Sequence, residues 1–388
     1  MTTGRIYFKG LNGIRAIAAL VVVVAHTGQY LTLFGLPPSD YYRWHWQSFA
    51  VTLFFVLSGY LITFLMLEEK ARTATISLRG FYLRRIFRIW PLYYLIIFIT
   101  LCLYQFFPMS GVPQIPAAPL ACYTVLLANV AMHLQVAVTP LSPLWSIGVE
   151  EQFYALWPVI MKKSASAVRM LLLVIGVYLT VKAAVIPLKS DLITALVAET
   201  RIDCMAIGGF GAVILRENGR LLRYIYSRFA QAFCWLLFLY STLYKPVHIM
   251  SSIDHEFYAV TFMIIILNVS TNDATMVNLE KPWFDFMGKI SYGLYIYHMM
   301  AIFLLSAVTK QLVSPTWQCY FLIYAGVLSL TTITAYLSFR YFELPFLKIK
   351  DRFSVVLSQA SGVVESKGSI HSRVDGADRR AKGGSIEL

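Results

Sequence analysis

Residues 12–34 read NGIRAIAALVVVVAHTGQYLTLF, an apolar run that one arginine and one histidine interrupt. A bilayer core about 30 Å thick needs about 20 mostly apolar residues in an α-helix, and this run is long enough. It follows a basic N-terminus, as in a signal peptide, but it lacks a clear small-residue cleavage site. We therefore predict a retained first transmembrane helix.

The rest of the chain has the same apolar character. Hydrophobic residues make up 58% of the 388 residues and charged residues 14%, whereas soluble proteins have about 45–50% and about 25%. This composition excludes a disordered chain, a disulfide-stapled mini-domain and most soluble enzymes, and the long apolar runs exclude an outer-membrane barrel. The five cysteines are scattered through apolar stretches without metal-ligand spacing, so we expect small buried residues and no metal site.

Apolar runs of spanning length recur along the chain. Convincing runs lie near residues 12–34, 46–67, 90–107, 168–188, 290–312 and 317–341. Shorter or less pure runs lie near 144–161, 203–216, 229–244 and 257–270. A further stretch, 119–135, is bounded by proline-rich segments, and it either spans the bilayer or dips in and returns.

The distribution of positive charge decides between these options. With ten spans, cytoplasmic termini and no crossing at 119–135, inner segments hold 25 of the 33 Lys and Arg residues and outer segments hold five. The positive-inside rule requires such a bias, which also accounts for the net charge of +13 without a nucleic-acid partner. We predict an all-α polytopic bundle of about ten transmembrane helices plus one re-entrant or surface helix.

The chain is predicted to carry its function in one membrane domain, residues 1–346. Residues 347–388 are rich in Gly and Ser with mixed charges, which is typical of a disordered extension. Because both termini are expected inside, we predict that this extension is a cytoplasmic tail.

Two ionisable residues lie in the first span, where each needs a reason because burial in lipid is costly. Arg15 and His26 are eleven residues apart, which places them on one helix face about 16 Å apart along the axis. Taken alone, Arg15 is also explained as a cation that snorkels to the membrane surface. Taken alone, His26 is also explained by an interhelical hydrogen bond. Together they favour a polar pathway.

A cluster of arginines precedes the third convincing run. Arg84, Arg85 and Arg88 follow one another at i, i+1 and i+4, so they share one side of a helix. Guanidinium groups bind phosphate bidentately, and such a cluster can hold a pyrophosphate at the membrane surface. The alternative is topology-setting charge against anionic lipid.

Three further motifs place polar groups in apolar surroundings. Residues 143–158 read PLWSIGVEEQFYALWP, in which Ser146 and Glu150 face the same side and Glu151 points about 100° away. A structural ion pair is the alternative for one of these carboxylates. His298 lies in a Tyr-rich span, where packing with a hydrogen bond is the default, and Glu343 and Pro345 close the final span as a cap or lock.

Taken together, these motifs resemble the membrane-bound acyltransferase family 3 of bacterial sugar O-acyltransferases over roughly residues 8–346. The matching elements, in chain order, are Arg15-x10-His26, residues 54–62 (FFVLSGYLI), Arg85-x-x-Arg88, the Trp-Ser-x-x-x-Glu-x-Gln-Phe-Tyr pattern at 145–154, Ser291 through His298, and Glu343 with Pro345. Some relatives carry an extra span and an extracytoplasmic esterase-like domain. We expect this chain to be the stand-alone form.

The resemblance implies transfer of an acyl group, usually acetyl, from cytoplasmic acyl-CoA to a hydroxyl of an extracytoplasmic or lipid-linked sugar. The expected enzyme is an acetyl-CoA-dependent sugar O-acetyltransferase that needs no metal. Expected acceptors include the O-antigen of lipopolysaccharide and exopolysaccharide, and the polysaccharide-synthesis machinery is a candidate partner besides membrane lipid. The expected location is the bacterial cytoplasmic (inner) membrane.

The resemblance also suggests roles for individual residues. His26 is expected to act as general base, with Glu150 as its partner and Ser146 as a hydrogen-bond donor. Arg15 is expected to steady the pantetheine end of the donor or the oxyanion. The CoA phosphates are expected to be bound by Arg84, Arg85 and Arg88. The substrate is expected to contact Trp145, Tyr154 and His298. A covalent acyl-His intermediate is an alternative to direct transfer.

Two other classes of function compete with this interpretation. A secondary transporter of a sugar or acyl derivative also explains buried His and Glu residues, but transporters often show inverted repeats in matching halves, and none is visible here. A purely structural partner in a polysaccharide-synthesis complex would leave the arginine cluster without a role.

Overall fold

The computed structural model describes residues 6–38, 46–106, 115–134, 139–188, 190–249, 253–309 and 316–354. In these residues the regular elements are all helices. Six helices are long and apolar enough to cross a membrane, which supports the predicted multi-pass helical membrane protein. They are α1 (Leu11–Gln29), α2 (Trp46–Thr73), α3 (Leu78–Phe106), α7 (Ala167–Val185), α14 (Ser291–Thr309) and the continuous helix Trp317–Asp351.

The predicted count of ten spans requires four further helices. These are α6 (Leu144–Lys163), α9 (Ile202–Glu217), α11 (Arg228–Leu243) and α12 (Asp254–Thr271). Their 16 to 20 residues correspond to about 24–30 Å, which is at or below the thickness of the hydrocarbon core. Three of the shorter helices are α8 (Asp191–Thr200), α10 (Gly219–Ile225) and α13 (Pro282–Lys289).

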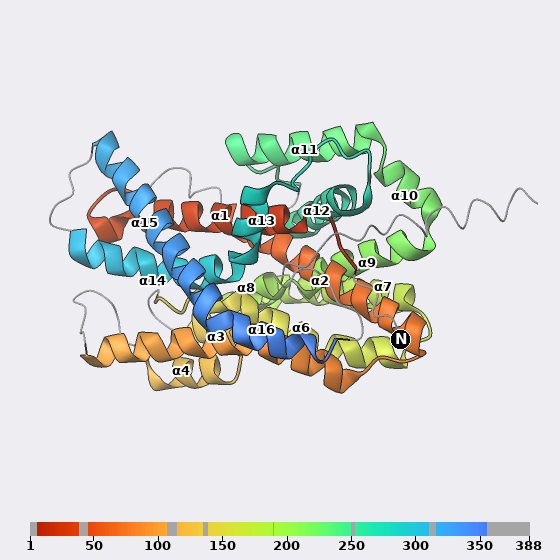
Figure 1. The fold of residues 1–388 in the computed structure, drawn as a ribbon, viewed down its shortest axis with the longest axis horizontal. Coiled ribbons are helices and arrows are strands. Elements are labelled where there is room, and N and C mark those ends of the chain that lie inside the picture. The colour runs from red at the N-terminus through yellow and green to blue at the C-terminus, as the bar shows by residue number, and fades with distance from the viewer. Residues whose placement is uncertain are drawn as a thin grey trace, which may run out of the picture.

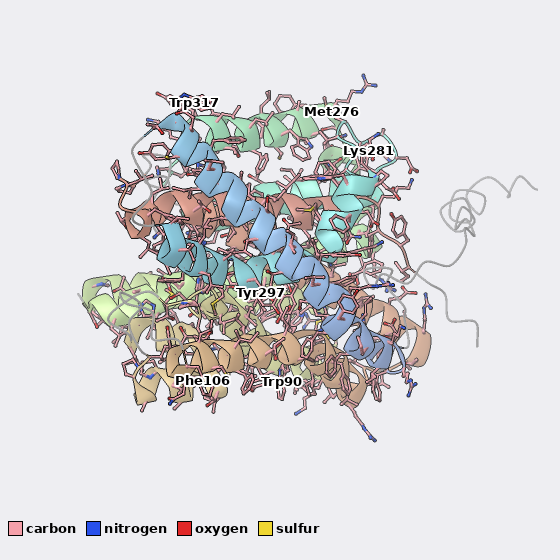
Figure 2. The ribbon with its side chains drawn as sticks, turned by 60° about the vertical axis from the view of Figure 1, so that its left-hand side comes forward. Trp90, Phe106, Met276, Lys281, Tyr297 and Trp317 are labelled. Atoms are coloured by element: carbon pink, nitrogen blue, oxygen red, sulfur yellow. The ribbon has the colours of Figure 1, made fainter. Side chains whose placement is uncertain are left out.

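Helices α1 and α14 lie side by side in the middle of the molecule (Figure 1). Helix α3 runs along one edge and α11 along the opposite edge, while α15 (Trp317–Ser338) crosses the bundle diagonally (Figure 1). Figure 2 shows the same diagonal course of α15, from Trp317 past Tyr297 of α14. The apolar helices thus enclose a core in which α1, α2, α3, α6 and α14 can present side chains to one another.

Two glycines allow the backbones of α2 and α9 to touch. A Cβ atom on Gly59 would lie 1.9 Å from the carbonyl oxygen of Met205, and one on Gly208 would lie 2.0 Å from that of Val56. Small residues at such crossings let membrane helices pack closely. This contact fixes which face of α2 is left for the neighbouring helices.

The stretch 119–135 forms two short helices rather than one span. Helices α4 (Ala117–Thr124) and α5 (Ala128–Leu134) are separated by a turn in which Leu126 has a φ of 64°. With 8 and 7 residues they are only about 11–12 Å long, so neither can cross the bilayer by itself. The hydroxyl of Tyr93 donates to the carbonyl of Tyr123 at 2.8 Å, which holds α4 against α3.

The last helix continues past the position where the sequence predicts its end. Helix α15 (Trp317–Ser338) passes through a π-helical turn (Phe339–Glu343) into α16 (Leu344–Asp351). Pro345 removes one backbone donor and would crowd a regular α-helix, and the wider turn just before it accommodates the ring.

The predicted domain boundary at residue 346 therefore falls inside α16. This helix packs on α3, and the ring of Phe353 just beyond it stacks on Phe87 with 5.8 Å between centroids. The rest of the predicted tail, residues 355–388, lies outside the described residues.

Candidate functional site

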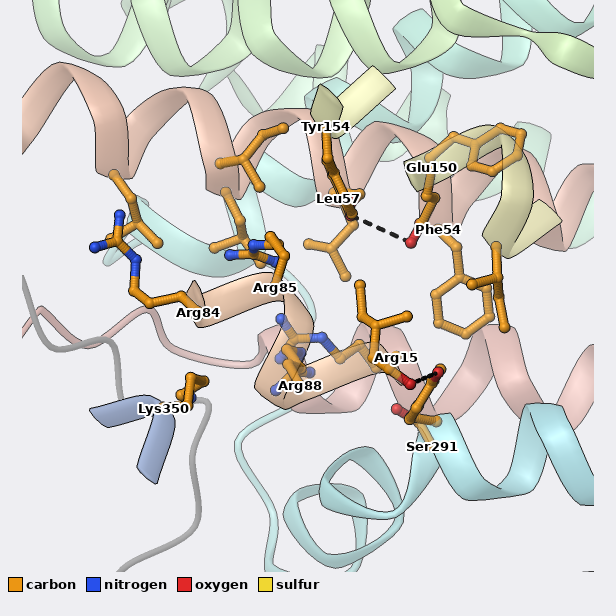
Figure 3. A pocket seen from close by; sticks show the side chains of 18 of the residues that line it. Arg15, Phe54, Leu57, Arg84, Arg85, Arg88, Glu150, Tyr154, Ser291 and Lys350 are labelled. Carbon is orange, nitrogen blue, oxygen red and sulfur yellow. Dashed lines mark hydrogen bonds between the residues drawn. The ribbon is translucent and has the colours of Figure 1, made fainter. Parts of the chain in front are cut away.

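A pocket of about 160 Å³ opens between α1, α2, α3, α6, α14 and α16 (Figure 3). Apolar side chains of α2, including Leu57 and Leu61, form one wall. Seven of the residues singled out from the sequence line the pocket: Arg15, Arg84, Arg85, Arg88, Ser146, Glu150 and Tyr154. These seven residues come from three separate motifs, which therefore meet in one cavity.

Three of the cations that line this pocket, Arg85, Arg88 and Lys350, form what we call the cation cluster. The Arg85 guanidinium lies over the ring of Tyr154, 5.3 Å from its centroid, and its buried Nε atom makes no hydrogen bond to the described residues. Neither Arg85 nor Arg88 forms an ion pair with a carboxylate in the described part of the chain. The cluster thus has unused capacity to bind an anion.

Lys350 is a pocket residue that the sequence analysis missed. It belongs to α16, lines the pocket and is only 8% exposed, with its Nζ atom 3.3 Å from a carboxylate oxygen of Asp351. The sequence assigned this stretch to a disordered tail because its composition is polar. In residues 346–351, FLKIKD, apolar residues alternate with the lysines. This pattern is the signal that could have revealed a packed amphipathic helix.

Arg84 lines the same pocket but is engaged by the protein. Its Nη2 atom lies 3.1 Å from Glu69, and its Nη1 atom donates to the carbonyl of Phe353 at 2.8 Å. Glu69 is 2% exposed and also accepts the backbone N–H of Ser77 at 2.8 Å. Arg84 therefore ties α3 to α2 and to the segment after α16, and it has less capacity for a ligand than Arg85.

The two adjacent carboxylates of α6 have different surroundings. Glu150 lines the pocket and accepts a hydrogen bond from Tyr154 at 3.2 Å, drawn in Figure 3, while the Tyr154 hydroxyl also contacts Ser58. Glu151 accepts from the indole Nε1 of Trp90 at 2.9 Å. Glu151 thus links two helices, and Glu150 is the carboxylate that faces the cavity.

Ser146 and a tyrosine of α14 close the inner part of the pocket. The Ser146 hydroxyl lies 2.7 Å from the Tyr295 hydroxyl, which is also 3.1 Å from the carbonyl of Pro143. Tyr295 was not singled out from the sequence, although it lies in the Tyr-rich motif that ends at His298. Both hydroxyls line the pocket.

His26 pairs with His298 and not with Glu150. The Nδ1 atom of His26 lies 2.9 Å from Nε2 of His298, and the two rings stack at 16°. No hydrogen bond or ion pair joins His26 to Glu150 among the described residues. The reason is that Glu150 is held by Tyr154 on its own helix, whereas α14 places a histidine directly beside His26.

The pocket and the histidine pair reach the same depth in the bundle. Gln47 of α2 donates to Gln29 of α1 at 3.2 Å, and the ring of Phe8 meets that of Tyr60 near the other end. The two helices are therefore antiparallel, and His26 lies level with residues near 50 of α2. Val51 lines the pocket, whereas His26 and His298 are not among its lining side chains.

Trp145 faces a second group of charges near the other end of α2. Its ring lies 5.6 Å from the guanidinium of Arg201, which donates to the carbonyl of Ser48 at 2.9 Å. Lys182 contacts Glu256 and lies 3.6 Å from Asp203. We call Lys182, Arg201, Asp203 and Glu256 the paired cluster.

The paired cluster was not predicted, although Lys182 within an apolar run was a signal for it. No group of three or more His, Cys, Asp or Glu side chains that could hold a metal ion is found within the described ranges.

Comparisons with known proteins agree with this picture. The family model described as an acyltransferase domain matches residues 8–340. An O-acetyltransferase of Staphylococcus aureus strain NCTC 8325 / PS 47, OatA, is 26% identical over 365 residues, which cover 88% of this chain and 57% of the relative. A provisionally named O-acetyltransferase of strain COL is 25% identical over 367 residues, covering 88% of this chain and 58% of the relative. The chain thus spans a little over half the length of these curated relatives. No solved structure matches.

Proposed function

Because the chain belongs to the acyltransferase domain family, we propose that it is an integral membrane O-acyltransferase that moves an acyl group, most simply acetyl, from acyl-CoA to a sugar hydroxyl. The observation that carries this proposal is the cation cluster: its two arginines, Arg85 and Arg88 of α3, form no ion pair with a carboxylate of the described residues. The cluster lines a pocket that extends as deep into the bundle as the histidine pair. The names of the relatives support the O-acetyl part of the proposal.

The cation cluster is the proposed binding site for the phosphates of the donor. Coenzyme A carries a pyrophosphate and a 3′-phosphate, and guanidinium groups bind phosphate through paired hydrogen bonds. The buried Nε of Arg85, which lacks a partner among the described residues, fits such an anion. The apolar wall of Leu57 and Leu61 then suits the uncharged pantetheine arm, which leads the thioester inward.

The acceptor is proposed to approach from the opposite side of the membrane. In this scheme the bundle has ten spans with cytoplasmic termini and resides in the inner membrane of a bacterium, as the positive-inside bias indicates. The acceptor would be an extracytoplasmic or lipid-linked glycan such as O-antigen or exopolysaccharide, with the polysaccharide-synthesis machinery as a partner.

The proposed chemistry is direct transfer with His26 as general base. The imidazole takes the proton of the sugar hydroxyl while that oxygen attacks the thioester carbonyl, and the tetrahedral intermediate then expels the CoA thiolate. The thiolate takes the proton from His26, so the base is regenerated. Ser146 and Arg15 are the proposed donors to the oxyanion or to the end of the pantetheine arm, because both line the cavity.

The test is the acetyl-ester content of the envelope glycans in cells that express the chain. A His26→Ala variant is expected to lower the ester acetate released by mild alkali at least about 100-fold, because a general base contributes about 10²–10⁴ to the rate. Tyr30→Phe, which preserves the ring stacked on His26, is the matched control. Normal membrane insertion with parental acetylation in His26→Ala would disprove the assignment of the base.

The same cells separate this proposal from the transporter alternative. Membranes of a transferase are expected to release the CoA thiol when acetyl-CoA and the native glycan are both present. A transporter that performs no chemistry would release none above the background of cells without the chain.

A further inference from the structure

Two imidazoles from different helices form a hydrogen-bonded pair in the core of the bundle. His26 comes from α1 and His298 from α14, and Nδ1 of the first lies 2.9 Å from Nε2 of the second. His298 is fully buried, whereas His26 keeps part of its surface exposed. Because each ring nitrogen either donates or accepts, the partners of the pair decide where the protons lie.

The proton of His298 is fixed by the backbone of its own helix. Its Nδ1 atom lies 2.6 Å from the carbonyl oxygen of Tyr295. A carbonyl oxygen accepts hydrogen bonds and cannot donate them, so Nδ1 of His298 carries a proton. A neutral His298 then has its lone pair on Nε2, the atom that faces His26.

The proton of His26 follows from that of His298. Nε2 of His298 accepts, so Nδ1 of His26 must donate, and the lone pair of His26 lies on Nε2. The opposite arrangement would require a doubly protonated His298. Such an arrangement would place a full positive charge on a ring that is 0% exposed and that no carboxylate of the described residues contacts through a hydrogen bond. Burying an unpaired charge is far more costly than burying a neutral imidazole.

We propose that His298 is a positioning residue that holds His26 in the Nδ1–H tautomer and so leaves the Nε2 atom of His26 free to act as the base. This inference rests on the proposed function and assigns His298 a different role from the substrate contact expected from the sequence. In serine hydrolases a carboxylate orients the catalytic histidine in this way and stabilises its charged form. Here a neutral imidazole takes that place.

The proton balance of the reaction is unchanged by this role. When the sugar oxygen bonds to the acyl carbon, its proton moves to Nε2 of His26, and the resulting imidazolium keeps its Nδ1–H bond to His298. When the carbon–sulfur bond of the thioester breaks, the CoA thiolate takes the proton from Nε2. His298 neither gains nor loses a proton, so it affects the turnover rate rather than donor binding.

The experiment compares His298→Leu with His298→Gln in membrane vesicles that contain the native glycan acceptor, with release of CoA thiol as the readout. Leu removes the acceptor for His26, whereas the side-chain oxygen of Gln can replace it. His298→Leu is expected to lower kcat about 100-fold, by analogy with the roughly 10–100-fold effect of removing a group that orients a metal-bound histidine. The KM for acetyl-CoA is expected to stay within about 2-fold, and His298→Gln is expected to recover most of the loss.

A double variant tests whether the two histidines act as one unit. His26→Ala combined with His298→Leu is expected to be no slower than His26→Ala alone, because residues that act together are non-additive. Equal losses in the Leu and Gln variants, or a parental kcat in His298→Leu, would overturn the inference while an inactive His26→Ala still upholds the proposed function. A fully active His26→Ala would instead overturn the proposed function itself.

Discussion

The cation cluster and the paired cluster lie near opposite ends of α2, and both bury basic side chains. In the paired cluster, Lys182 has two carboxylates within reach, Glu256 and Asp203. In the cation cluster, Arg85 and Arg88 have no carboxylate partner among the described residues, and Lys350 has only the adjacent Asp351. Lys182 is thus neutralised by carboxylates of the fold, whereas Arg85 and Arg88 form no ion pair among the described residues.

The difference separates a structural use of charge from a binding use. Removing one member of a buried ion pair leaves an uncompensated charge and costs about 3–5 kcal/mol, so the paired cluster contributes to the packing of α7, α9 and α12. Like charges gathered without counter-ions destabilise the protein until an anion arrives. The cation cluster is therefore best explained by a ligand that supplies the missing negative charge.

The largest effect is expected from breaking the paired cluster. Lys182→Ala removes the cation that lies within reach of both Asp203 and Glu256 and is expected to lower the free energy of unfolding by about 3–5 kcal/mol. Thermal unfolding in detergent measures the loss, with the exposed Lys163→Ala as control. The folded fraction of the Lys182→Ala variant is expected to keep the parental KM for acetyl-CoA. If Lys182→Ala changed the KM for acetyl-CoA and kept the parental stability, the paired cluster would not have the structural role that separates it from the cation cluster.

A loss of donor binding is expected from substitutions in the cation cluster. Arg85→Ala combined with Arg88→Ala removes two charge-assisted contacts of about 1.5–3 kcal/mol each, so the affinity for acetyl-CoA is expected to fall at least about 100-fold. Direct binding of acetyl-CoA to the purified protein measures this change. Arg79→Ala, an exposed arginine of the same helix, is the control. Parental affinity in the double variant would remove the donor site from the proposal.

The smallest effect is expected from the residue that the sequence missed. Lys350→Ala is expected to weaken acetyl-CoA binding about 10-fold, because Lys350 supplies a single point charge rather than a guanidinium fork. Lys348→Ala, two positions earlier and exposed, is expected to bind acetyl-CoA as the parent does. If both variants behave alike, Lys350 does not belong to the cation cluster.

Much of the site could be predicted because its motifs are local. The spacing of Arg15 and His26, and that of Ser146 and Glu150, follows from helix periodicity alone. Arg84 differs from Arg85 in its surroundings, since Glu69 and the carbonyl of Phe353 occupy its guanidinium. No local pattern could show this, because these two partners lie 15 and 269 residues away in the chain.

By itself, the sequence determined the membrane class of the fold, the helical character of the bundle and the motifs that line the pocket. These properties depend on composition and on periodicity within single helices, which are local. Only the tertiary structure decided which side chains meet: His298 rather than Glu150 beside His26, Lys350 at the pocket, and two carboxylates beside Lys182. Such pairings depend on how separate helices pack against one another, and the residues along any one helix do not specify that packing.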